Sequence, residues 1–362
     1  MGKYVSLKDF DWLLLVLLLL ISALGVVEIY STTAHSRFAG AHVKQIYWIL
    51  IGVSLMFLVC RYDYHDLLNH IPLIYILTLV ALVALLLLGS DISGARRWIR
   101  VGGFSFQVSE GVKLAIILLL ARFFSESHEE RVSLPEFAMV FLAIGVPGVL
   151  VAMQPDLGTA LTLLPIVMVT LFLAGMRWRY FGMLLLAGLM ILPVGLHFMK
   201  PYQKARIVTF MHPEQDPQKA GYQLLQSKIA VGSGQLWGKG TAQGTQTQLW
   251  FLPEPHTDFI FAAYAEEHGF LGVLFALLLY LFVLMRLVHN AKNAPDAGGM
   301  FIIGGVVAVL SFQILVNIGM VVGYAPVTGI PLPLMSYGGS SVLFVFLSMG
   351  LVNSVRVRRF VN

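Results

Sequence analysis

Residues Gly240 to Phe270 read Gly-Thr-Ala-Gln-Gly-Thr-Gln-Thr-Gln-Leu-Trp-Phe-Leu-Pro-Glu-Pro-His-Thr-Asp-Phe-Ile-Phe-Ala-Ala-Tyr-Ala-Glu-Glu-His-Gly-Phe. A polar, glycine-rich loop leads to His256, Thr257 and Asp258, and an apolar helix is predicted to begin directly after Asp258. We therefore expect Asp258 at the mouth of a membrane helix, where water gives way to lipid. The rest of the chain is interpreted as a frame around this position.

The composition is that of a membrane protein. Hydrophobic residues make up 58% of the 362 residues and charged residues only 12%, whereas about a quarter of a soluble domain is charged. The apolar residues fall in runs of about 17–25, the length that a helix needs to cross hydrocarbon. The predicted fold class is all-α, a polytopic integral membrane protein. The single Cys60 excludes an internal disulfide and a cysteine-built metal site, and the net charge of +5 calls for no nucleic acid.

About ten transmembrane helices are predicted in one transmembrane domain covering residues 1–362, so both termini lie on one side. The first run lacks a small-residue cleavage site and is interpreted as a helix rather than a removed signal. A large extracytoplasmic loop, about 200–257, follows the seventh span. It contains a predicted amphipathic helix, 222–231, and a glycine-rich segment, 232–244, expected to be mobile. The ten spans are 10–30, 44–60, 71–88, 108–125, 136–153, 157–175, 180–199, 258–286, 299–323 and 336–355.

The distribution of Lys and Arg orients the bundle, because cytoplasmic loops are enriched in both. With a cytoplasmic N-terminus, the short inner loops carry Arg61, Arg122, Arg131, Arg177, Arg179, Arg286 and Lys292. The inner ends add Lys3, Lys8, Arg356, Arg358 and Arg359. The short outer loops carry fewer, namely Arg37, Lys44, Arg96, Arg97 and Arg100. Both termini are thus predicted to be cytoplasmic, and Asp258 is predicted to face outward.

Polar residues within apolar segments are predicted to gather on the outer side, with no inner counterpart of similar polarity. They come from distant parts of the chain: Gln107, Ser109, Glu110, Lys113, Gln154, Asp156 and Ser336 to Ser341. Glu110 and Lys113 are spaced to pair on one helix. Ionisable residues within a span are usually functional, although a structural ion pair is the alternative. Glu267 is interpreted as buried structure and Glu266 as the partner of a Lys or Arg from elsewhere, and the sequence alone leaves both interpretations open.

Each candidate residue has two interpretations. Asp258 is either a helix N-cap or a general base, because a carboxylate can do both. Asp156, in a tight turn, either caps the next helix or helps to hold a divalent cation such as Mg²⁺. A basic outer rim either attracts anionic lipid headgroups or recognises a pyrophosphate, for which Arg offers two parallel hydrogen bonds. Trp98 is either an interfacial anchor or a stacking platform. The rim comprises Arg96, Arg97, Arg100, Lys204, Arg206 and Lys228.

The chain resembles the SEDS family, the bacterial shape, elongation, division and sporulation proteins, over essentially its whole length. It is most similar to the elongation members, because of the run Gly244-Thr-Gln through Leu252-Pro253-Glu254. Val108 departs from the family, which usually has Pro before Ser-Glu. The other matching segments are 94–98, Phe106 to Glu110 with Lys113, 154–159, 226–230, 256–261, 317–320 and 331–340.

The resemblance implies a peptidoglycan glycosyltransferase that polymerises lipid II at the outer membrane face, with a class B penicillin-binding protein as partner and membrane lipids around it. It carries the essential-aspartate role onto Asp258. The residues then expected to contact substrate are Arg97, Trp98, Gln107, Ser109, Glu110, Lys113, Gln154, Asp156, Lys204, Arg206, Lys228, His256, Thr257, Ser336 and Ser340. The metal, if any, is unknown. A lipid II flippase and a non-catalytic scaffold are the alternatives. A flippase predicts ionisable residues through the full depth of the bundle, and a scaffold predicts that changes at Asp258 are harmless.

Overall fold

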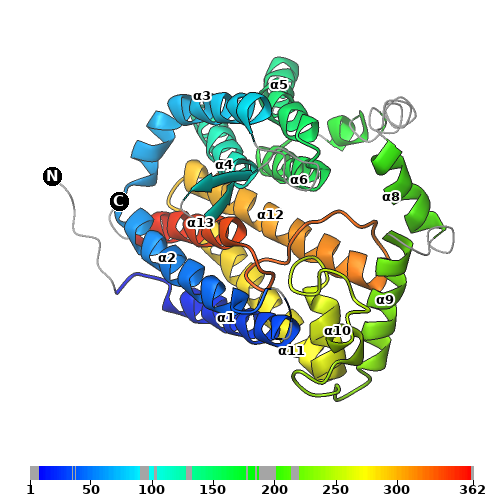
Figure 1. Ribbon diagram of the computed structural model, residues 1–362. Coiled ribbons are helices and arrows are strands. Elements are labelled where there is room, and N and C mark those ends of the chain that lie inside the picture. Colours follow the sequence, from blue (N-terminus) through cyan, green and yellow to red (C-terminus); the bar gives the residue numbers. More distant parts are fainter. Residues whose placement is uncertain are drawn as a thin grey trace.

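The computed structural model describes residues 8–34, 36, 38–89, 98–101, 104–127, 133–176, 178–183, 186, 201–212 and 220–359. Helices form nearly all of this structure (Figure 1). Seven of the described helices are long and apolar enough to cross a membrane, which confirms the helical membrane architecture. They are α1 (Trp12–Thr33), α2 (Ala41–Arg61), α3 (Tyr64–Leu88), α5 (Leu134–Met153), α11 (Ile260–Lys292), α12 (Ala297–Val322) and α13 (Gly339–Arg358).

Two more of the predicted spans are helices of a different character. α4 (Val108–Glu126) carries several charges, and α6 (Leu157–Leu173) is shorter than the seven. The predicted span 180–199 lies mostly outside the described residues. The predicted bounds of the other spans agree with the helices to within a few residues, except that α3 starts earlier, at Tyr64, and α11 ends later, at Lys292.

Several helices begin where a polar side chain can accept the first N–H groups. Asp296 Oδ1 accepts the N–H of Gly299 at 2.7 Å and thereby starts α12. At α5, Ser133 and Glu136 accept each other's backbone N–H groups in a capping box. These caps let long apolar helices start sharply after short polar connections.

The described part of the predicted outer loop contains three helices: α8 (Pro201–Met211), α9 (Ala220–Ser233) and α10 (Thr245–Gln248). α9 confirms the amphipathic helix. The expectation that the following glycine-rich segment is mobile is wrong, because the segment lies directly on α11. Lys239 N donates to Glu266 O at 3.0 Å. A β-carbon at Gly234 would come within 2.0 Å of Ala265 O, so glycine is needed for this close approach.

A two-stranded antiparallel hairpin precedes α4 and departs from the all-α prediction. β1 (Trp98–Val101) pairs with β2 (Phe104–Gln107), and Trp98 lies opposite Gln107. Aromatic and β-branched residues flank Gly102-Gly103 in the sequence, which is a hairpin signal. The two short strands lie over α4 and α13 (Figure 1).

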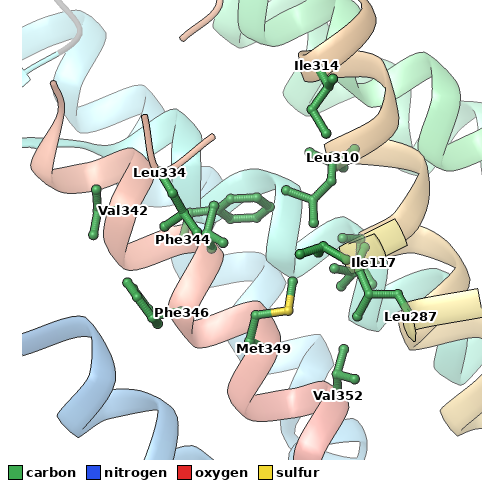
Figure 2. Packing of buried hydrophobic residues seen from close by; sticks show 14 of the residues in the cluster. Ile117, Leu287, Leu310, Ile314, Leu334, Val342, Phe344, Phe346, Met349 and Val352 are labelled. Atoms are coloured by element: carbon green, nitrogen blue, oxygen red, sulfur yellow. The ribbon is translucent and has the colours of Figure 1, made fainter. Parts of the chain in front are cut away.

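α13 is the central helix of the bundle and is mostly buried (Figure 1). Its largest interface is with α2. There a β-carbon at Gly350 would lie 2.9 Å from the Met56 carbonyl oxygen, so the two backbones approach closely. Figure 2 shows Phe344 and Met349 of α13 pointing toward α12 and α4. Because α13 contacts helices from both halves of the chain, it fixes where their ends meet.

At the end of the bundle opposite Asp258, a buried cluster surrounds Asp11. Its carboxylate accepts from Arg286 Nε at 2.8 and 3.0 Å and from Asn290 Nδ2 at 2.8 Å, and Arg356 Nη1 lies 3.3 Å away. The expectation of no inner polar counterpart is therefore wrong. Burial raises the pKa of Asp11, but the hydrogen bonds from Arg286 and Asn290 and the charge of Arg356 outweigh it, so the pKa lies below its usual range.

This cluster predicts a pH-dependent stability. Because the pKa of Asp11 is lower in the folded chain, its contribution is present above the unfolded pKa of about 3.9 and is lost as the pH falls through the folded pKa. Asp11→Asn keeps a capping side chain but removes the charge. We expect a loss of about 1.5–3 kcal/mol at pH 7, as for hydrogen bonds to charged groups. The measurement is the thermal unfolding midpoint. Glu126→Gln removes an exposed carboxylate paired with Arg122 and is the control, and an equal shift in both variants would contradict the prediction.

Candidate active site

Asp258 lies in the turn before α11 and is partly exposed. α11 begins at Ile260, Phe259 occupies its N-cap position, and the Phe259 side chain makes no capping hydrogen bond. Asp258 is therefore not the N-cap residue of α11, contrary to the first interpretation.

The backbone that carries Asp258 is fixed by side chains from other parts of the chain. Asn317 of α12 is fully buried and donates from Nδ2 to Asp258 O at 3.0 Å and to Ile330 O at 2.8 Å. Ser336 Oγ donates to Thr257 O at 2.7 Å. Irregular backbone in a membrane protein requires such partners. The position of the Asp258 carboxylate is thus set by a well-satisfied main chain.

His256 and Ser336 extend this support to the first two helices. The buried His256 ring lies 4.6 Å from the Phe38 ring and 6.0 Å from the Tyr337 ring, centroid to centroid. Gln45 of α2 donates from Nε2 to Ser336 O at 3.2 Å. Of the predicted contact residues, His256 is therefore placed by ring packing, and Thr257 and Ser336 by their mutual hydrogen bond.

The loop between α12 and α13 faces the Asp258 carboxylate. Gly329 has a φ of +73°, and a β-carbon there would lie 3.7 Å from Asp258 Oδ2. The neighbouring Thr328 carbonyl accepts from Arg206 Nη1 of α8 at 3.4 Å. The guanidinium of Arg206 and the carboxylate of Asp258 thus lie next to the same two residues. Gly329 itself is exposed, so this side of the site is open.

Asp156 organises a second polar cluster. It caps α6 through Oδ1, which accepts from Thr159 N at 3.3 Å, and this confirms the capping interpretation. Its Oδ2 accepts from Gln107 Nε2 at 2.6 Å, Ser109 Oγ at 3.1 Å and Thr159 Oγ1 at 2.9 Å. A carboxylate oxygen has about two lone-pair sites, so three donors saturate Oδ2. That Asp156 also helps to hold a divalent cation stays a prediction.

Gly158 joins the two clusters. A β-carbon at Gly158 would lie 2.7 Å from Thr328 O and 3.1 Å from Ile330 Cγ1. The start of α6 therefore touches the loop that faces Asp258, and any side chain at Gly158 would displace that loop. The predicted gathering of distant polar segments at one end of the bundle is confirmed for these residues.

The hairpin brings two further predicted residues to the cluster. Trp98 and Gln107 are directly opposite across the strands, so their side chains project from the same face. Gln107 N donates to Ser340 Oγ at 2.8 Å. Arg97, one residue before Trp98, lies outside the described residues.

Glu110 and Lys113 form the predicted pair on α4. Their side chains are 2.8 Å apart, and the two residues are only 5% and 0% exposed. Lys113 Nζ also lies 4.1 Å from the centroid of the Phe344 ring on α13. The pair is therefore enclosed, with the ammonium resting on the aromatic face.

The other predicted residues have different surroundings. Gln154 Nε2 donates to Leu82 O of α3 at 3.0 Å, away from the Asp156 cluster. Lys228 lies against Gly323 at the C-terminal end of α12, where a β-carbon would come within 2.5 Å of Nζ and where a cation is favourable. Lys204 is exposed on α8. Arg206 is placed beside the Asp258 loop by its hydrogen bond to the Thr328 carbonyl.

Sequence reasoning missed several residues of the site. Asn317 and Gln45 were not singled out for a role, although an amide within an apolar helix usually has a fixed partner. Thr328 and Gly329 carried no recognisable signal, because their importance comes only from the close approach of Gly158 and Asp258.

One cavity, of about 460 Å³, is unrelated to this site. Leu13, Leu17, Phe282, Met285, Arg286 and His289 line it, between α1 and α11 at the opposite end of the bundle. Its walls are largely apolar, and it holds none of the polar residues described above.

Sequence comparison identifies relatives over almost the whole chain. The profile of the cell cycle protein family that includes FtsW, RodA and SpoVE matches residues 11–360. Peptidoglycan glycosyltransferase MrdB of Escherichia coli is 39% identical over 95% of this chain and 93% of its own length. Stage V sporulation protein E of Bacillus subtilis is 38% identical over 97% and 98%. Peptidoglycan glycosyltransferase RodA of Treponema pallidum is 32% identical over 98% and 99%.

Solved structures share the fold. A chain described in work on the structural coordination of polymerization and crosslinking by a peptidoglycan synthase complex superposes with a TM-score of 0.84 at 32% identity, covering 98% of this chain and 99% of that chain. The rod shape determining protein RodA of Thermus thermophilus superposes with a TM-score of 0.73 at 30% identity, covering 97% and 98%.

The enclosed pair on α4 predicts opposite outcomes for single and double substitutions. Lys113→Ala leaves Glu110 buried without its cation and should cost about 3–5 kcal/mol of stability. Glu110→Gln with Lys113→Met removes both charges at similar volume and should be close to the wild type. Thermal unfolding in one detergent compares the variants. A double variant as unstable as Lys113→Ala would show that the charges themselves stabilise the fold.

Proposed function

The chain belongs to the FtsW, RodA and SpoVE family of cell cycle proteins, and from this premise we propose its reaction. It is a peptidoglycan glycosyltransferase that polymerises lipid II into glycan strands at the outer face of the bacterial cytoplasmic membrane. The reaction serves cell elongation and maintenance of rod shape, and it releases undecaprenyl pyrophosphate.

One observation carries the assignment of the catalytic residue. Asp258 sits on a backbone held by Asn317 and Ser336, is not the N-cap residue of α11, and faces the exposed Gly329. A carboxylate so placed can meet a substrate hydroxyl without a change in the main chain. We assign Asp258 as the general base.

The proposed step is one in-line displacement. Asp258 takes the proton from the 4-hydroxyl of the N-acetylglucosamine of an incoming lipid II, and that oxygen attacks the anomeric carbon of the growing glycan. The bond from this carbon to the pyrophosphate breaks on the opposite face, so the configuration changes from α to β. Undecaprenyl pyrophosphate leaves as an anion and needs no protonating acid, unlike the leaving group of a glycosidase.

Charge that grows on the pyrophosphate must be offset by cations. Arg206 lies beside the Thr328–Gly329 segment, and its guanidinium suits two phosphate oxygens. We propose that Arg97, Lys204 and Lys228 complete the binding surface. Mg²⁺ stays a prediction to which no step is assigned, because the described residues bring three metal-ligand side chains together only elsewhere in the molecule.

Two buried polar atoms near Asp258, Asn317 Oδ1 and Thr328 Oγ1, have no hydrogen-bond partner among the described residues. We propose that the hairpin, with Trp98 and Gln107, and the start of α4, with Ser109, shape the side of the site formed by Asp156, and that Glu110 and Lys113 position that end of α4.

We further propose ten membrane spans with both termini in the cytoplasm. α4, α6 and the predicted span 180–199 would join the seven helices described above. The excess of Lys and Arg in the inner loops and at both termini supports this orientation. The outer loop and Asp258 would then face the periplasmic or cell-wall side.

A class B penicillin-binding protein is the proposed partner, through its membrane helix and the adjoining outer region. α11 supports this, because it exposes a continuous series of large apolar residues that include Leu274, Leu278, Leu281 and Met285. Their helical spacing makes one face on which a single membrane helix can lie.

Replacement of Asp258 by Asn is the experiment that tests the function. We expect polymerisation of lipid II to fall by about a hundredfold or more, since general-base catalysis contributes about 10²–10⁴-fold. Thermal stability should change little, because Asn keeps the size of the side chain and an oxygen that can accept a hydrogen bond. Both quantities are measured on one purified preparation. The control is Glu254→Gln, an exposed carboxylate in the same loop.

A stable Asp258→Asn variant that polymerises lipid II at the wild-type rate would sink the assignment and would leave a scaffold as the explanation. No observation favours a flippase, because the described charges at the other end of the bundle, around Asp11, pair with one another.

The orientation has its own test. In a Cys60→Ala background, single cysteines replace two exposed residues, Thr241 in the outer loop and Asn293 after α11. We expect a membrane-impermeant maleimide added to whole cells or spheroplasts to label Thr241→Cys, and to label Asn293→Cys only after lysis. The reverse pattern would overturn the proposed topology.

A further inference from the structure

Three metal-ligand side chains meet at a place that the proposed reaction does not use. Glu28 of α1 and Glu267 and His268 of α11 bring one ligand atom each to within 4.8 Å of one another. Glu28 and Glu267 are buried and His268 is partly exposed. The cluster lies where the outer end of α1 meets α11 and the outer loop.

A break in α11 forms this place. Gly269 has φ +64° and ψ −166°, so the helix is interrupted directly after His268. Phe270 N donates instead to Gln235 O of the outer loop at 2.8 Å. A β-carbon at Gly269 would lie 2.3 Å from Gly238 N, so the position requires glycine.

Two of the carboxylates at this place, Glu266 and Glu267, have hydrogen-bond or ion-pair partners. Glu266 is fully buried, and Lys239 Nζ donates to it at 2.6 Å. Glu267 accepts from Ser31 Oγ at 2.5 Å and from Ala242 N at 3.1 Å. Their surroundings resemble those of ordinary buried carboxylates, which are hydrogen-bonded or ion-paired.

Glu28 differs from both. It is 0% exposed, and neither carboxylate oxygen has a hydrogen-bond partner among the described residues. His268 lies close by, with Nδ1 3.7 Å from Oε2. Lys239 is already bound to Glu266, so with its carboxyl groups ionised the cluster holds more negative than positive charge. A buried carboxylate in this state is strongly unfavourable unless it takes up a proton or binds a cation.

We propose that Glu28, Glu267 and His268 bind one divalent transition-metal cation, of which Zn²⁺ is the probe. Two carboxylates and an imidazole are ligands for such ions, and a charge of +2 balances the two carboxylates. With bonds of about 2.1 Å, ligand atoms around a tetrahedral Zn²⁺ are about 3.4 Å apart. The separation of 3.7 Å between Glu28 and His268 is close to this value.

The surroundings of His268 permit the binding. Its ring is stacked 4.4 Å from the Tyr264 ring, and Nδ1 lies 3.3 Å from Tyr264 O, a contact that the ion would replace. The His268 side chain is 28% exposed, which gives the ion a route from outside. Because Glu267 also holds Ala242 N, the ion fastens the glycine-rich outer segment to α1 and α11.

Metal content and thermal stability test the site without any activity assay. The purified full-length protein is stripped with a chelator, incubated with Zn²⁺ or with Mg²⁺, and desalted. We expect one equivalent of Zn²⁺ per chain to remain and the unfolding midpoint to rise by several degrees. Mg²⁺, which prefers oxygen ligands, should do neither. Glu28→Gln and His268→Gln should each abolish Zn²⁺ retention and the Zn²⁺-dependent rise.

The controls separate this site from other sources of metal binding. Asp258→Asn and Glu254→Gln should retain Zn²⁺ as the wild type does. If Glu28→Gln does not fold, His268→Gln still tests the site, because it changes a partly exposed residue. Two results would overturn the proposal. One is Zn²⁺ retention that is equal in the wild type and in His268→Gln. The other is a wild type whose unfolding midpoint does not respond to Zn²⁺, together with a Glu28→Gln variant whose midpoint is higher than that of the wild type. That result would mean that the buried carboxyl group binds no ion and only destabilises the fold.

Discussion

The amide of Asn317 donates to two carbonyls of chain segments that are not helical, at Asp258 and Ile330. Backbone within a membrane bundle has little water to bind, so any departure from a helix needs a donor or acceptor from elsewhere. Ser336 and Gln45 satisfy the neighbouring backbone in the same way. The Asp258 carboxylate lies where two such segments meet.

Glycine residues also let these segments approach one another closely. The positions 158 and 329 carry no β-carbon, and through them α6, the loop after α12 and Asp258 come into contact. Side chains would separate these elements by the thickness of an atom or more. The site is thus defined by main-chain proximity as much as by its polar groups, and Asp156 and Arg206 reach it through backbone neighbours.

Much of this was readable in the sequence, for physical reasons. The bilayer fixes the length of an apolar run, so most of the spans could be located to within a few residues. Residues three apart on a helix face each other, which was enough to pair Glu110 with Lys113. Polar residues inside apolar helices had to face one another, so their common location followed from the order of the spans.

Other features depend on distances that no local pattern encodes. The short hairpin was not predicted from the sequence, because its strands are only four residues each and the rest of the pattern is helical. Gly102-Gly103 was the hairpin's one turn signal in the sequence. The glycine-rich outer segment suggested mobility, yet those glycines permit backbone contact with α11. Gln154 resembled its neighbour Asp156 in the sequence, but its amide binds α3 instead. Whether Asp258 is the N-cap residue depended on the first residue of α11. The helix begins at Ile260, two residues after Asp258, so Phe259 occupies the N-cap position.

The buried charges of α4 also bear on how the chain enters the membrane during synthesis. Each charged residue costs about 2.5–3.5 kcal/mol at the centre of a helix that partitions from the translocon into lipid. Any window of α4 long enough to span the bilayer contains at least three charged residues, and α4 is not among the seven helices that satisfy a simple apolar criterion. A newly made α4 is therefore a poor substrate for insertion by itself. It has to rely on α3, which is made before it and packs against it, and Lys113 meets the Phe344 ring only when α13, the last of the described helices in chain order, is in place.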